Sequence, residues 1–377
     1  MTFSSFDLDP TVLDALRDLN YEIPTPIQEK AIPEVLAGHD LIALAETGSG
    51  KTAACAIPIC HAIDINASGI QALIVVPTRE LALQYATETQ KIGKVKNVKT
   101  FAILGGEDMN MQRAKLKDGV HVLVATPGRL IDFIYARAID LTHVEIIVLD
   151  EADQMLGMGF VEDLEFIMDC LVQTHQTLLF SATMPKEIQS IAVTRMRNPK
   201  EIRLIGTKPS PENLDHKFIF CANPHKKTEE IVRLLEVLQP KQCLIFGNSR
   251  GEVESLCRIL KRKFSSVDFL HGGLEQNVRS SITGKFSKGR IRFLVASDVA
   301  ARGLDFSQVT HVINLHFPRD QEGYLHRSGR TGRSGAHGTC ITLVSKREFG
   351  KVHRLFKYLK KKPTWIGDEP QEFHRVD

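Results

Sequence analysis

The sequence of 377 residues lacks the patterns that mark several classes of protein. Its seven cysteines include no CxxC pair, which argues against a disulfide framework or a zinc site and favours reduced, buried thiols. No apolar stretch approaches the ~20 residues of a membrane span. The first ten residues, MTFSSFDLDP, are acidic and contain no apolar signal core. We therefore expect a cytoplasmic protein without a membrane association.

Charge is divided unevenly along the chain. Residues 1–206 contain 18 Lys and Arg against 27 Asp and Glu, a net charge of −9, whereas residues 207–377 contain 30 against 18, a net charge of +12. A basic second half can supply long-range attraction for a polyanion such as a nucleic acid. Ordinary surface variation gives the same asymmetry, so charge alone leaves both interpretations open.

The order of apolar runs predicts an α/β fold in two domains. Strand-like runs alternate with helical patterns in the first half, which indicates a parallel sheet with helices on both faces, and the alternation repeats in the second half. The expected strands are 41–45, 72–76, 100–104, 121–125, 145–149 and 177–181, then 243–246, 267–270, 292–296, 310–315 and 339–344. The clearest helical patterns are 51–64, 79–92, 160–172, 225–238, 250–263 and 275–287.

A stretch rich in Pro and Gly separates the two halves. Residues 206–213, GTKPSPEN, have no periodicity and read as a flexible linker. We therefore predict a first domain at 1–206, a linker at 207–213, a second domain at 214–362 and a short tail at 363–377.

A glycine-rich turn after the first strand has the form of a phosphate-binding loop. It reads AETGSGKT at 45–52, with Ala45 where this pattern usually opens on glycine. Glycines allow backbone N–H groups to face phosphates, and the following helix adds its positive N-terminal end. Lys51 would reach the β- and γ-phosphates, and Thr52 would hold Mg²⁺. The other loop residues expected to bind the nucleotide are Glu46, Thr47, Gly48, Ser49 and Gly50.

Acidic residues follow the strand at 145–149. Asp150 would bind Mg²⁺ through water, and Glu151 would orient or deprotonate the attacking water. Asp153 lies too far along the chain to share the ion, so we expect it to hold other groups of the site. A carboxylate after a strand is often merely solvated, but the phosphate-binding loop makes that interpretation weak here.

An N-terminal segment supplies groups suited to adenine. The amide of Gln28 can both donate to and accept from adenine, whereas guanine would mismatch it. Tyr21 could stack on the base, with Phe3 and Phe6 packed behind it. We count Phe3, Tyr21 and Gln28 among the nucleotide-binding residues.

Three arginines occur at a three-residue spacing in the second half, at positions 327, 330 and 333 of HRSGRTGR (326–333). Together with a phosphate-binding loop and an acidic strand end in the first half, they suggest that two lobes close on one nucleotide. That arrangement favours a motor or a clamp over a simple kinase.

With these motifs the sequence resembles the DEAD-box RNA helicases of superfamily 2, as a minimal two-domain core of the bacterial type. The resemblance covers about residues 3–345. The motifs, in the order typical of the family, are a Gln motif within 1–29, AETGSGKT (45–52), PTREL (77–81), Gly105-Gly106, TPGR (126–129), DEAD (150–153), SAT (181–183), IFGNSR (245–250), HGGLEQNVR (271–279), ASDVAARGLD (296–305) and HRSGRTGR (326–333). The resemblance implies two tandem RecA-like domains joined by a flexible linker.

The resemblance also implies roles for further residues. Arg330 and Arg333 would act on the γ-phosphate, with Arg333 as the arginine finger, and Asp305 would contact the ribose. Ser181 and Thr183 would couple hydrolysis to lobe movement together with Asp153. The RNA-binding residues would be Pro77, Thr78, Arg79, Gly106, Thr126, Gly128, Arg129, His271, Gly272, Gln276, Arg279 and Ser297. Such contacts address the RNA backbone and carry no sequence information.

The function that follows is an ATP-dependent RNA helicase. We expect RNA-stimulated ATP hydrolysis, local unwinding of short duplexes and remodelling of RNA–protein complexes by a monomer, with ribosomal or degradosome-type complexes as candidate partners. Two alternatives remain open: an ATP-gated RNA clamp or assembly scaffold whose unwinding is incidental, and a DNA helicase.

Overall fold

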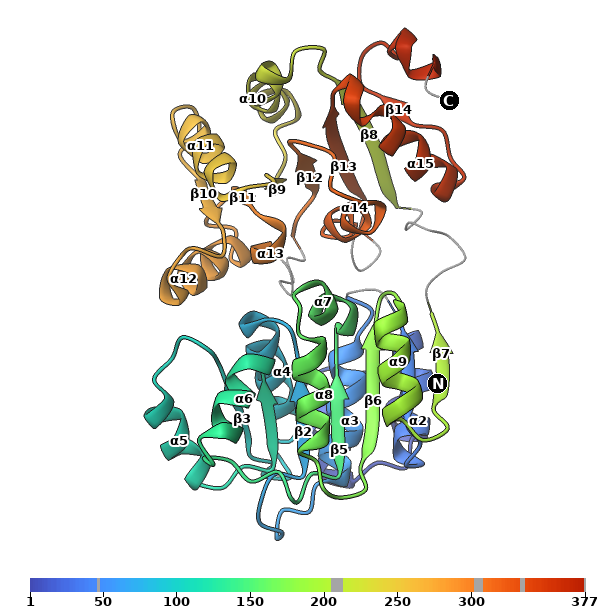
Figure 1. Cartoon of the computed structure of the whole chain (residues 1–377), viewed down its shortest axis with the longest axis vertical. Coiled ribbons are helices and arrows are strands. Elements are labelled where there is room, and N and C mark those ends of the chain that lie inside the picture. The colour runs from blue at the N-terminus through green and yellow to red at the C-terminus, as the bar shows by residue number, and fades with distance from the viewer. Residues whose placement is uncertain (46–47, 205–212, 302–307, 333–335, 376–377) are drawn as a thin grey trace. The chain divides into compact units, whose positions relative to one another are not determined.

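The computed structural model describes residues 1–45, 48–204, 213–301, 308–332 and 336–375 (Figure 1). The chain forms two compact units, Met1–Ile205 and Gly206–Asp377. Of the linker expected at 207–213, only Asn213 belongs to the described residues.

The first unit is built on a sheet of seven strands. Their order is β3-β4-β2-β5-β6-β1-β7, and every pairing is parallel. The strands are β1 Leu41–Leu44, β2 Ala72–Val75, β3 Thr100–Ile103, β4 Val122–Ala125, β5 Ile146–Leu149, β6 Gln176–Ser181 and β7 Lys200–Arg203.

Helices cover both faces of this sheet (Figure 1). They are η1 Phe3–Ser5, α1 Pro10–Asp18, α2 Pro26–Leu36, α3 Lys51–Ala62, α4 Arg79–Ile92, α5 Met109–Lys117, α6 Pro127–Tyr135, α7 Ala152–Gly157, α8 Val161–Asp169 and α9 Lys186–Arg195. Successive side chains of a strand point to opposite faces. Accordingly Leu41 and Ala43 join one apolar cluster with α1–α4, whereas Ile42 and Leu44 join a second cluster with α6–α9.

The second unit repeats this architecture. Its sheet is also parallel, in the order β10-β11-β9-β12-β13-β8-β14. The strands are β8 Leu214–Phe220, β9 Cys243–Phe246, β10 Val267–Leu270, β11 Phe293–Ala296, β12 His311–Asn314, β13 Gly338–Val344 and β14 Thr364–Trp365. The helices are η2 Pro224–Lys226, α10 Lys227–Leu238, α11 Arg250–Lys261, α12 Gln276–Ser287, α13 Asp298–Ala301, α14 Gln321–Ser328, η3 Lys346–Glu348, α15 Phe349–Leu359 and η4 Gln371–Arg375.

The segment expected as a tail packs onto the second unit. Trp365 lies in β14, which pairs with β8, and its ring meets Phe218 at 6.0 Å and Phe373 at 5.0 Å between ring centres. Phe373 in turn stacks on His353 of α15 at 3.9 Å. Aromatic contacts therefore tie this segment to the sheet and to α15.

These observations confirm the α/β fold class with parallel sheets. Each of the eleven strands expected from apolar runs is present within two residues of its predicted bounds. Three strands were not predicted: β7, β8 and β14. In the part of the chain that the structure describes, no helix combines the length and apolar character that crossing a membrane requires.

One buried carboxylate joins three segments of the first unit, and we predict that its removal destabilises that unit. Asp40 is 3% exposed, and its side chain accepts from the backbone N–H groups of Thr177 at 2.9 Å and Arg197 at 2.5 Å. Asp40→Ala leaves both donors without this acceptor, so the free energy of unfolding should fall by about 2–4 kcal/mol. Calorimetry of the purified variant measures the change.

A matched control uses a carboxylate on the surface. Asp14 pairs with Arg17 at 2.7 Å, but the two side chains are 57% and 69% exposed. Asp14→Ala should therefore change the free energy of unfolding by less than about 1 kcal/mol. Equal losses in the two variants would contradict the role given to Asp40.

Candidate active site

The carboxyl ends of the parallel strands in the first unit bring the predicted site residues to one edge of its sheet. The adjacent strands β5, β6 and β1 end beside Asp150, Ser181 and the phosphate-binding loop. The adjacent strands β3, β4 and β2 end beside the predicted RNA-binding residues Gly106, Thr126 and Pro77. The predicted nucleotide-binding and RNA-binding residues thus occupy neighbouring halves of the same edge, where open α/β sheets bind ligands.

The phosphate-binding loop packs against the N-terminal segment. Gly50 precedes α3 with φ +97°, and a Cβ at this position would lie 2.7 Å from the Gln28 amide nitrogen and 2.8 Å from Thr25 Oγ1. Gln28 is buried, and its Nε2 donates to the Gly50 carbonyl at 3.2 Å while its Oε1 accepts from Thr25 N at 2.9 Å. Only glycine allows this approach. Glu46 and Thr47 lie outside the described residues.

Lys51 and Asp150 form a buried ion pair. Their Nζ and Oδ1 atoms are 3.6 Å apart, the side chains are 6% and 3% exposed, and Lys51 Nζ also donates to the Ala45 carbonyl at 3.1 Å. Burial alone would lower the pKa of Lys51, but the carboxylates of Asp150, Glu151 and Asp153 together outweigh it and raise that pKa. The lysine is therefore a cation held beside three carboxylates.

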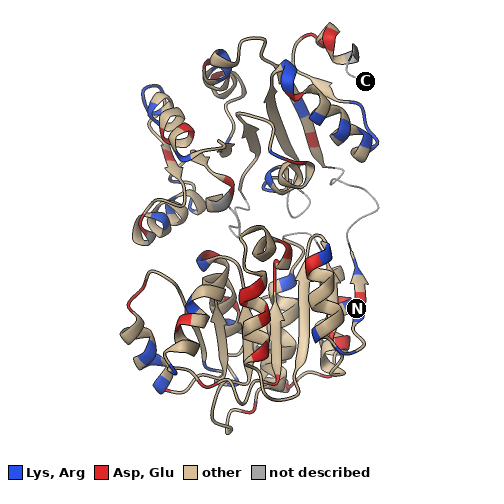
Figure 2. Ribbon diagram, in the orientation of Figure 1, with Lys and Arg blue, Asp and Glu red and all other residues tan. Residues whose placement is uncertain are grey.

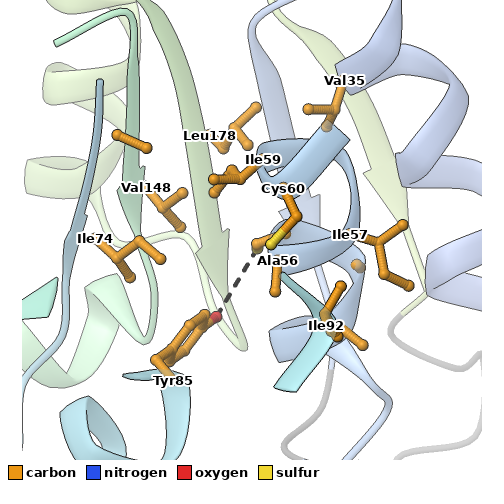
Figure 3. Packing of buried hydrophobic residues seen from close by; sticks show 14 of the residues in the cluster. Val35, Ala56, Ile57, Ile59, Cys60, Ile74, Tyr85, Ile92, Val148 and Leu178 are labelled. Carbon is orange, nitrogen blue, oxygen red and sulfur yellow. Dashed lines mark hydrogen bonds between the residues drawn. The ribbon is translucent and has the colours of Figure 1, made fainter. Parts of the chain in front are cut away.

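Tyr85 holds the other oxygen of Asp150. It lies on α4 with no exposed surface, among buried apolar residues (Figure 3). Its hydroxyl donates to Asp150 Oδ2 at 2.6 Å. The Cys55 sulfur, on α3, lies 3.8 Å from the same hydroxyl. Burial, together with the charge of Asp150, raises the pKa of Tyr85, so the hydroxyl remains a donor. Asp150 is thus held by Tyr85 at Oδ2 and by Lys51 at Oδ1.

The turn after β5 has an unusual backbone. Glu151 is buried at φ 53°, ψ 46°, a left-handed conformation that costs an L-residue roughly 1–2 kcal/mol. Its N–H group bonds Asp150 Oδ1 at 2.8 Å. Strain of this kind persists where the surrounding structure enforces it, and it is concentrated at functional sites.

Asp153 contacts both predicted coupling residues. Its Oδ2 accepts from the backbone N–H of Thr183 at 2.9 Å and from the Thr183 hydroxyl at 3.0 Å, while its own N–H donates to Ser181 Oγ at 3.2 Å. The end of β6 and the first turn of α7 therefore form one hydrogen-bonded unit.

The aromatic residues of the N-terminal segment lie together. Phe3 and Phe6 are buried, and the Phe3 ring meets the half-buried Tyr21 ring at 5.7 Å and an edge-on angle of 72°. The Tyr21 hydroxyl donates to Glu88 of α4. Tyr21 is therefore held from behind by Phe3 and at its tip by Glu88.

Two predicted RNA-binding arginines meet at the loop after β3. Arg79 contacts the Gly105 carbonyl and, at 3.3 Å, Glu107, and a Cβ on Gly106 would lie 2.5 Å from its guanidinium. Both terminal nitrogens of Arg129 donate to the Glu107 carbonyl at 3.1 Å. The loop is thus anchored by the side chains expected to contact RNA.

The remaining residues of this set in the first unit lie at or near the N-termini of α4 and α6. Thr78 is the N-cap of α4, where its hydroxyl accepts from Leu81 N at 3.3 Å, and Thr126 is the N-cap of α6. Pro77 is buried, and Gly128 is exposed. Helix N-termini of this kind present N–H groups to anions.

In the second unit, the predicted RNA-binding residues follow β10 and β11. His271 is 4% exposed, with Nε2 2.8 Å from Glu254 and Nδ1 accepting from Gly273 N at 3.1 Å. Gly272 is exposed, and Arg279 and Ser297 are half-buried. The side chain of Gln276 lies outside the described residues, as do Asp305 and Arg333.

Arg327, the first of the three spaced arginines, connects four segments of the second unit. It is 2% exposed, forms two bonds with Asp298 at 2.5 and 2.6 Å, and donates to Asn248 at 2.8 Å. It also donates to Asn314 at 3.3 Å. Arg330 is likewise buried, at 3% exposure. Arg327 therefore fixes α14, and Arg330 lies two residues beyond the end of that helix.

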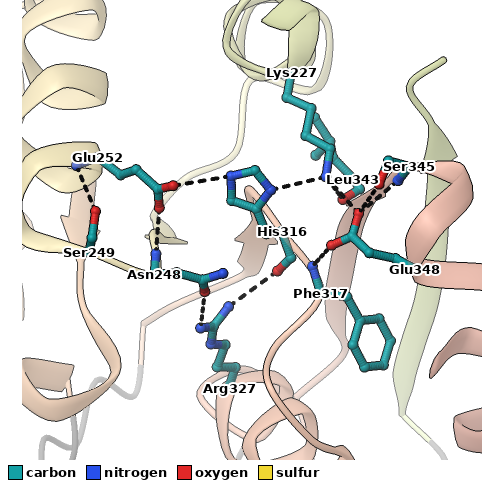
Figure 4. A network of polar contacts seen from close by, with 10 residues as sticks. All are labelled: Lys227, Asn248, Ser249, Glu252, His316, Phe317, Arg327, Leu343, Ser345 and Glu348. Atoms are coloured by element: carbon teal, nitrogen blue, oxygen red, sulfur yellow. Dashed lines mark hydrogen bonds and ion pairs between the residues drawn. The ribbon is translucent and has the colours of Figure 1, made fainter. Parts of the chain in front are cut away.

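A polar network continues from Arg327 to α10 (Figure 4). His316 lies between Glu252 at 3.5 Å and Lys227 at 3.1 Å, and the buried Lys227 bonds Glu348 at 2.9 Å. Burial and the Lys227 charge lower the pKa of His316, so the ring accepts from Lys227 through Nδ1. Burial alone would raise the pKa of Glu348, but hydrogen bonds from Ser345 and the Lys227 charge lower it.

Sequence reasoning overlooked several residues of these networks. Tyr85 lies in the predicted helix 79–92 but was given no role, and Glu107 and Gln112 lie outside every motif. Gln112 joins the loop after β3 by donating to Glu107 at 2.9 Å. The spacing of Arg327 marked it, but gave no role.

Family models match part of each unit, and relatives match most of the chain. Residues 25–191 match the DEAD/DEAH box helicase family and residues 226–335 match the helicase conserved C-terminal domain. The ATP-dependent RNA helicase CshA of Listeria monocytogenes is 44% identical over 369 residues, which span 96% of this chain and 71% of the relative. The Geobacillus kaustophilus protein of the same name is 43% identical over 96% of this chain and 77% of its own length.

Solved structures give the same fold. Dbp5 of S. cerevisiae bound to RNA and ADP BeF3 matches with a TM-score of 0.88 and 28% identity, over 97% of this chain and 95% of that one. Mss116p bound to ssRNA and AMP-PNP matches with a TM-score of 0.87 and 31% identity, over 99% and 81%. These matches confirm two tandem RecA-like domains. By its domain models and by its relatives, the chain belongs to the DEAD-box ATP-dependent RNA helicases.

Proposed function

We propose that this chain couples hydrolysis of ATP to the local separation of short RNA duplexes, with hydrolysis serving release of the strand. The observation that carries the proposal is the division of one sheet edge between β5-β6-β1, which ends in the nucleotide residues, and β3-β4-β2, which ends in the predicted RNA residues. A single rigid sheet can thereby hold both ligands side by side. RNA and a nucleotide analogue occur together in the Dbp5 and Mss116p structures, which supports the proposal.

The chain's own residues divide the nucleotide chemistry between them. Lys51 would leave Asp150 for the β- and γ-phosphates, Gln28 would read adenine, and Tyr21 would stack on the base. Glu151, held in its left-handed turn beside Asp150, would orient the attacking water and accept its proton. Arg330 and Arg333 would stabilise charge on the transferred phosphoryl group, and Asp305 would contact the ribose.

The residues present also fit Mg²⁺. A carboxylate oxygen and a hydroxyl at a phosphate-binding loop are the donors that Mg²⁺ uses when substrate phosphates complete its shell. Asp150 Oδ1 faces Lys51 at 3.6 Å, which shows that this carboxylate reaches the loop, and Thr52 stands in the first turn of α3. Asp150 and Thr52 would hold the ion, which would neutralise charge on the phosphates.

RNA would be bound through its backbone. The predicted contacts are arginines, short loops with glycine and helix N-termini, which suit phosphates and 2′-hydroxyls rather than base edges. We therefore propose binding without sequence preference, by a cytoplasmic monomer acting on ribosomal or degradosome-type complexes. Crosslinking and sequencing of RNA trapped in cells by Glu151→Gln identifies the substrates.

The alternatives make different predictions. An RNA clamp would form long-lived RNA complexes with a non-hydrolysable nucleotide and unwind poorly. A pure clamp could dispense with Glu151, so the presence of this residue disfavours that alternative slightly. A DNA helicase would unwind a DNA duplex in preference to an RNA duplex of equal stability. Unwinding assays with both duplexes, beside complex lifetimes with AMP-PNP, separate the three functions.

The first functional prediction concerns adenine recognition. Gln28→Ala should weaken ATP binding roughly five- to a hundred-fold, since two or so hydrogen bonds of about 0.5–1.5 kcal/mol each are lost. RNA binding without nucleotide should remain nearly unchanged. Titrations with ATP and GTP test the assignment, which fails if the variant retains the parent's preference for adenine over guanine.

The second functional prediction separates binding from hydrolysis. Glu151→Gln should bind nucleotide, Mg²⁺ and RNA as the parent does, because Asp150 and Lys51 are unchanged, but turnover should be very slow because the water has lost its base. Single-turnover hydrolysis with RNA present measures the loss. Turnover within a few-fold of the parent would exclude Glu151 as the base.

The third functional prediction concerns the arginine finger. Arg333→Ala should reduce RNA-stimulated ATPase activity by about 10³–10⁵, since transition-state charge loses a cation, while nucleotide affinity changes little. Arg333→Lys should not restore activity, because an ammonium lacks the planar fork of donors.

The activities of Arg333→Ala and Arg333→Lys identify the arginine finger. If Arg333→Lys has full activity, Arg330 becomes the candidate. If Arg330→Ala is also fully active, the proposal of a catalytic site completed by the second lobe is wrong.

A further inference from the structure

Basic residues of the first unit are concentrated in one stretch. Residues 91–117 contain seven Lys and Arg and only two Asp and Glu, whereas the rest of residues 1–206 contains 11 against 25. Figure 2 shows the contrast between the Lys and Arg residues of α5 and the Asp and Glu residues of α8. A strongly basic stretch within an acidic unit is a local surface feature that the nucleotide site does not use.

This stretch surrounds a groove at the β3 edge of the sheet. β3 is the outermost strand on that side. The groove has a volume of about 510 Å³ and is lined by residues at the end of α4, the beginning of β3 and the end of α5. Lys94, Lys99 and Lys115 line it, with Asp118 as the one acidic residue of the lining. We call it the β3 groove.

The three lysines of the β3 groove are exposed and have no acidic partner. Among the described residues, none of them lies within ion-pair distance of a carboxylate, whereas Lys91 and Lys96 pair with Glu88 and Asp9. Lys99 Nζ donates to the backbone carbonyl of Asp118 at 3.1 Å, and Lys115 Nζ lies 5.5 Å from the Phe101 ring centre. Two of the three ammonium groups are therefore held in place without being neutralised.

The ends of α4 and α5 account for part of this pattern. A helix C-terminus stabilises nearby cations by about 0.3–1 kcal/mol each, so lysines are common there. That effect explains why lysines lie near these helix ends. It does not explain why three of them face one groove that has a single carboxylate in its lining.

The chemistry of the groove fits phosphates better than a protein. Protein interfaces are enriched in aromatic residues, Met and Arg, and depleted of Lys. Lysine binds phosphate as a point charge and does not require a planar partner. Phe101, the aromatic residue of the lining, is half-buried beneath Lys115.

The groove lies one strand length from the predicted RNA loops. β3 has four residues, so the Cα atoms at its two ends are only about 10 Å apart. Its carboxyl end leads into Gly105, Gly106 and Glu107, which contact Arg79 and Arg129, and its amino end leads back to Lys99 in the groove. An RNA strand on those loops can reach the groove by passing along a single strand and helix.

We propose that the β3 groove binds the phosphates of RNA that flanks the segment held at the carboxyl edge of the sheet. It would add affinity without sequence preference, and only for RNA that extends beyond that segment. The inference rests on the proposed RNA binding, so the test compares short with extended RNA.

The test measures affinity for oligouridine in the presence of AMP-PNP, at several salt concentrations. One probe is a short oligouridine that fills only the carboxyl-edge loops, and two others carry an extension at the 5′ or the 3′ end. The variant Lys94→Gln/Lys99→Gln/Lys115→Gln removes the three charges. The control Lys30→Gln/Lys186→Gln/Lys200→Gln removes three exposed charges elsewhere in the first unit.

For the parent and the control, one extended probe should bind more tightly than the short one. The groove variant should lose that gain while its affinity for the short probe stays within about twofold. The slope of log K against log salt for the extended probe should fall by about 2, since each phosphate contact with a single strand contributes about 0.7. Lys94→Gln/Lys115→Gln, which keeps the Lys99 bond to Asp118, should give about two thirds of that change.

Several results would overturn the inference. Equal binding of short and extended probes by the parent, an unchanged salt slope in the groove variant, or equal losses in the control would each exclude the groove as an RNA site. Binding of polyglutamate to the parent but not to the groove variant, without an effect of RNA extension, would assign the surface to an acidic protein instead. Failure of the parent to bind the short probe would instead contradict the proposed function.

Discussion

The buried pair of Lys51 and Asp150 is the constraint around which the first unit is arranged. Removing both charges from water is costly, and their attraction offsets the cost only when other groups complete the shell. The Ala45 carbonyl, the Tyr85 hydroxyl and the Glu151 N–H supply that shell. The pair thus requires the phosphate-binding loop, α4 and the turn after β5 to meet at one point.

By the roles proposed above, a bound nucleotide would rearrange this pair. A phosphate that draws Lys51 away would leave the buried Asp150 without its cation, and a bound metal ion would replace that cation. Nucleotide and metal binding should therefore support each other. The left-handed Glu151 and the bonds from Asp153 to Ser181 and Thr183 extend the arrangement to the end of β6.

Sequence patterns predicted the central strands well because those strands are buried on both faces. Leu41–Leu44 and Ile146–Leu149 are uninterrupted apolar runs, as expected for parallel sheets. β7 reads Lys-Glu-Ile-Arg and lies at an edge, β14 has two residues, and β8 alternates buried and half-buried side chains. These strands form because they pair with a neighbouring strand, and that pairing cannot be predicted from the local sequence.

The residues of the candidate site also fall into those that sequence patterns predicted and those that they did not. Lys51, Asp150 and Glu151 belong to motifs, so their positions were predictable. Tyr85 lies on a helix face that packs in the core, and only its hydroxyl contacts Asp150. Glu107 contacts Arg129 through its backbone carbonyl. Nothing in a sequence distinguishes such a tyrosine from an ordinary core aromatic. Only the fold brings α4 beside the end of β5.

The aromatic packing around Trp365 has a consequence for spectroscopy. Trp365 is the single tryptophan of the chain, and it lies in the second unit against Phe218, Phe349 and Phe373. Its emission therefore reports the integrity of the unit that contains Arg327 and is silent about the unit that contains the phosphate-binding loop. A denaturation curve recorded by tryptophan fluorescence would describe half of this molecule.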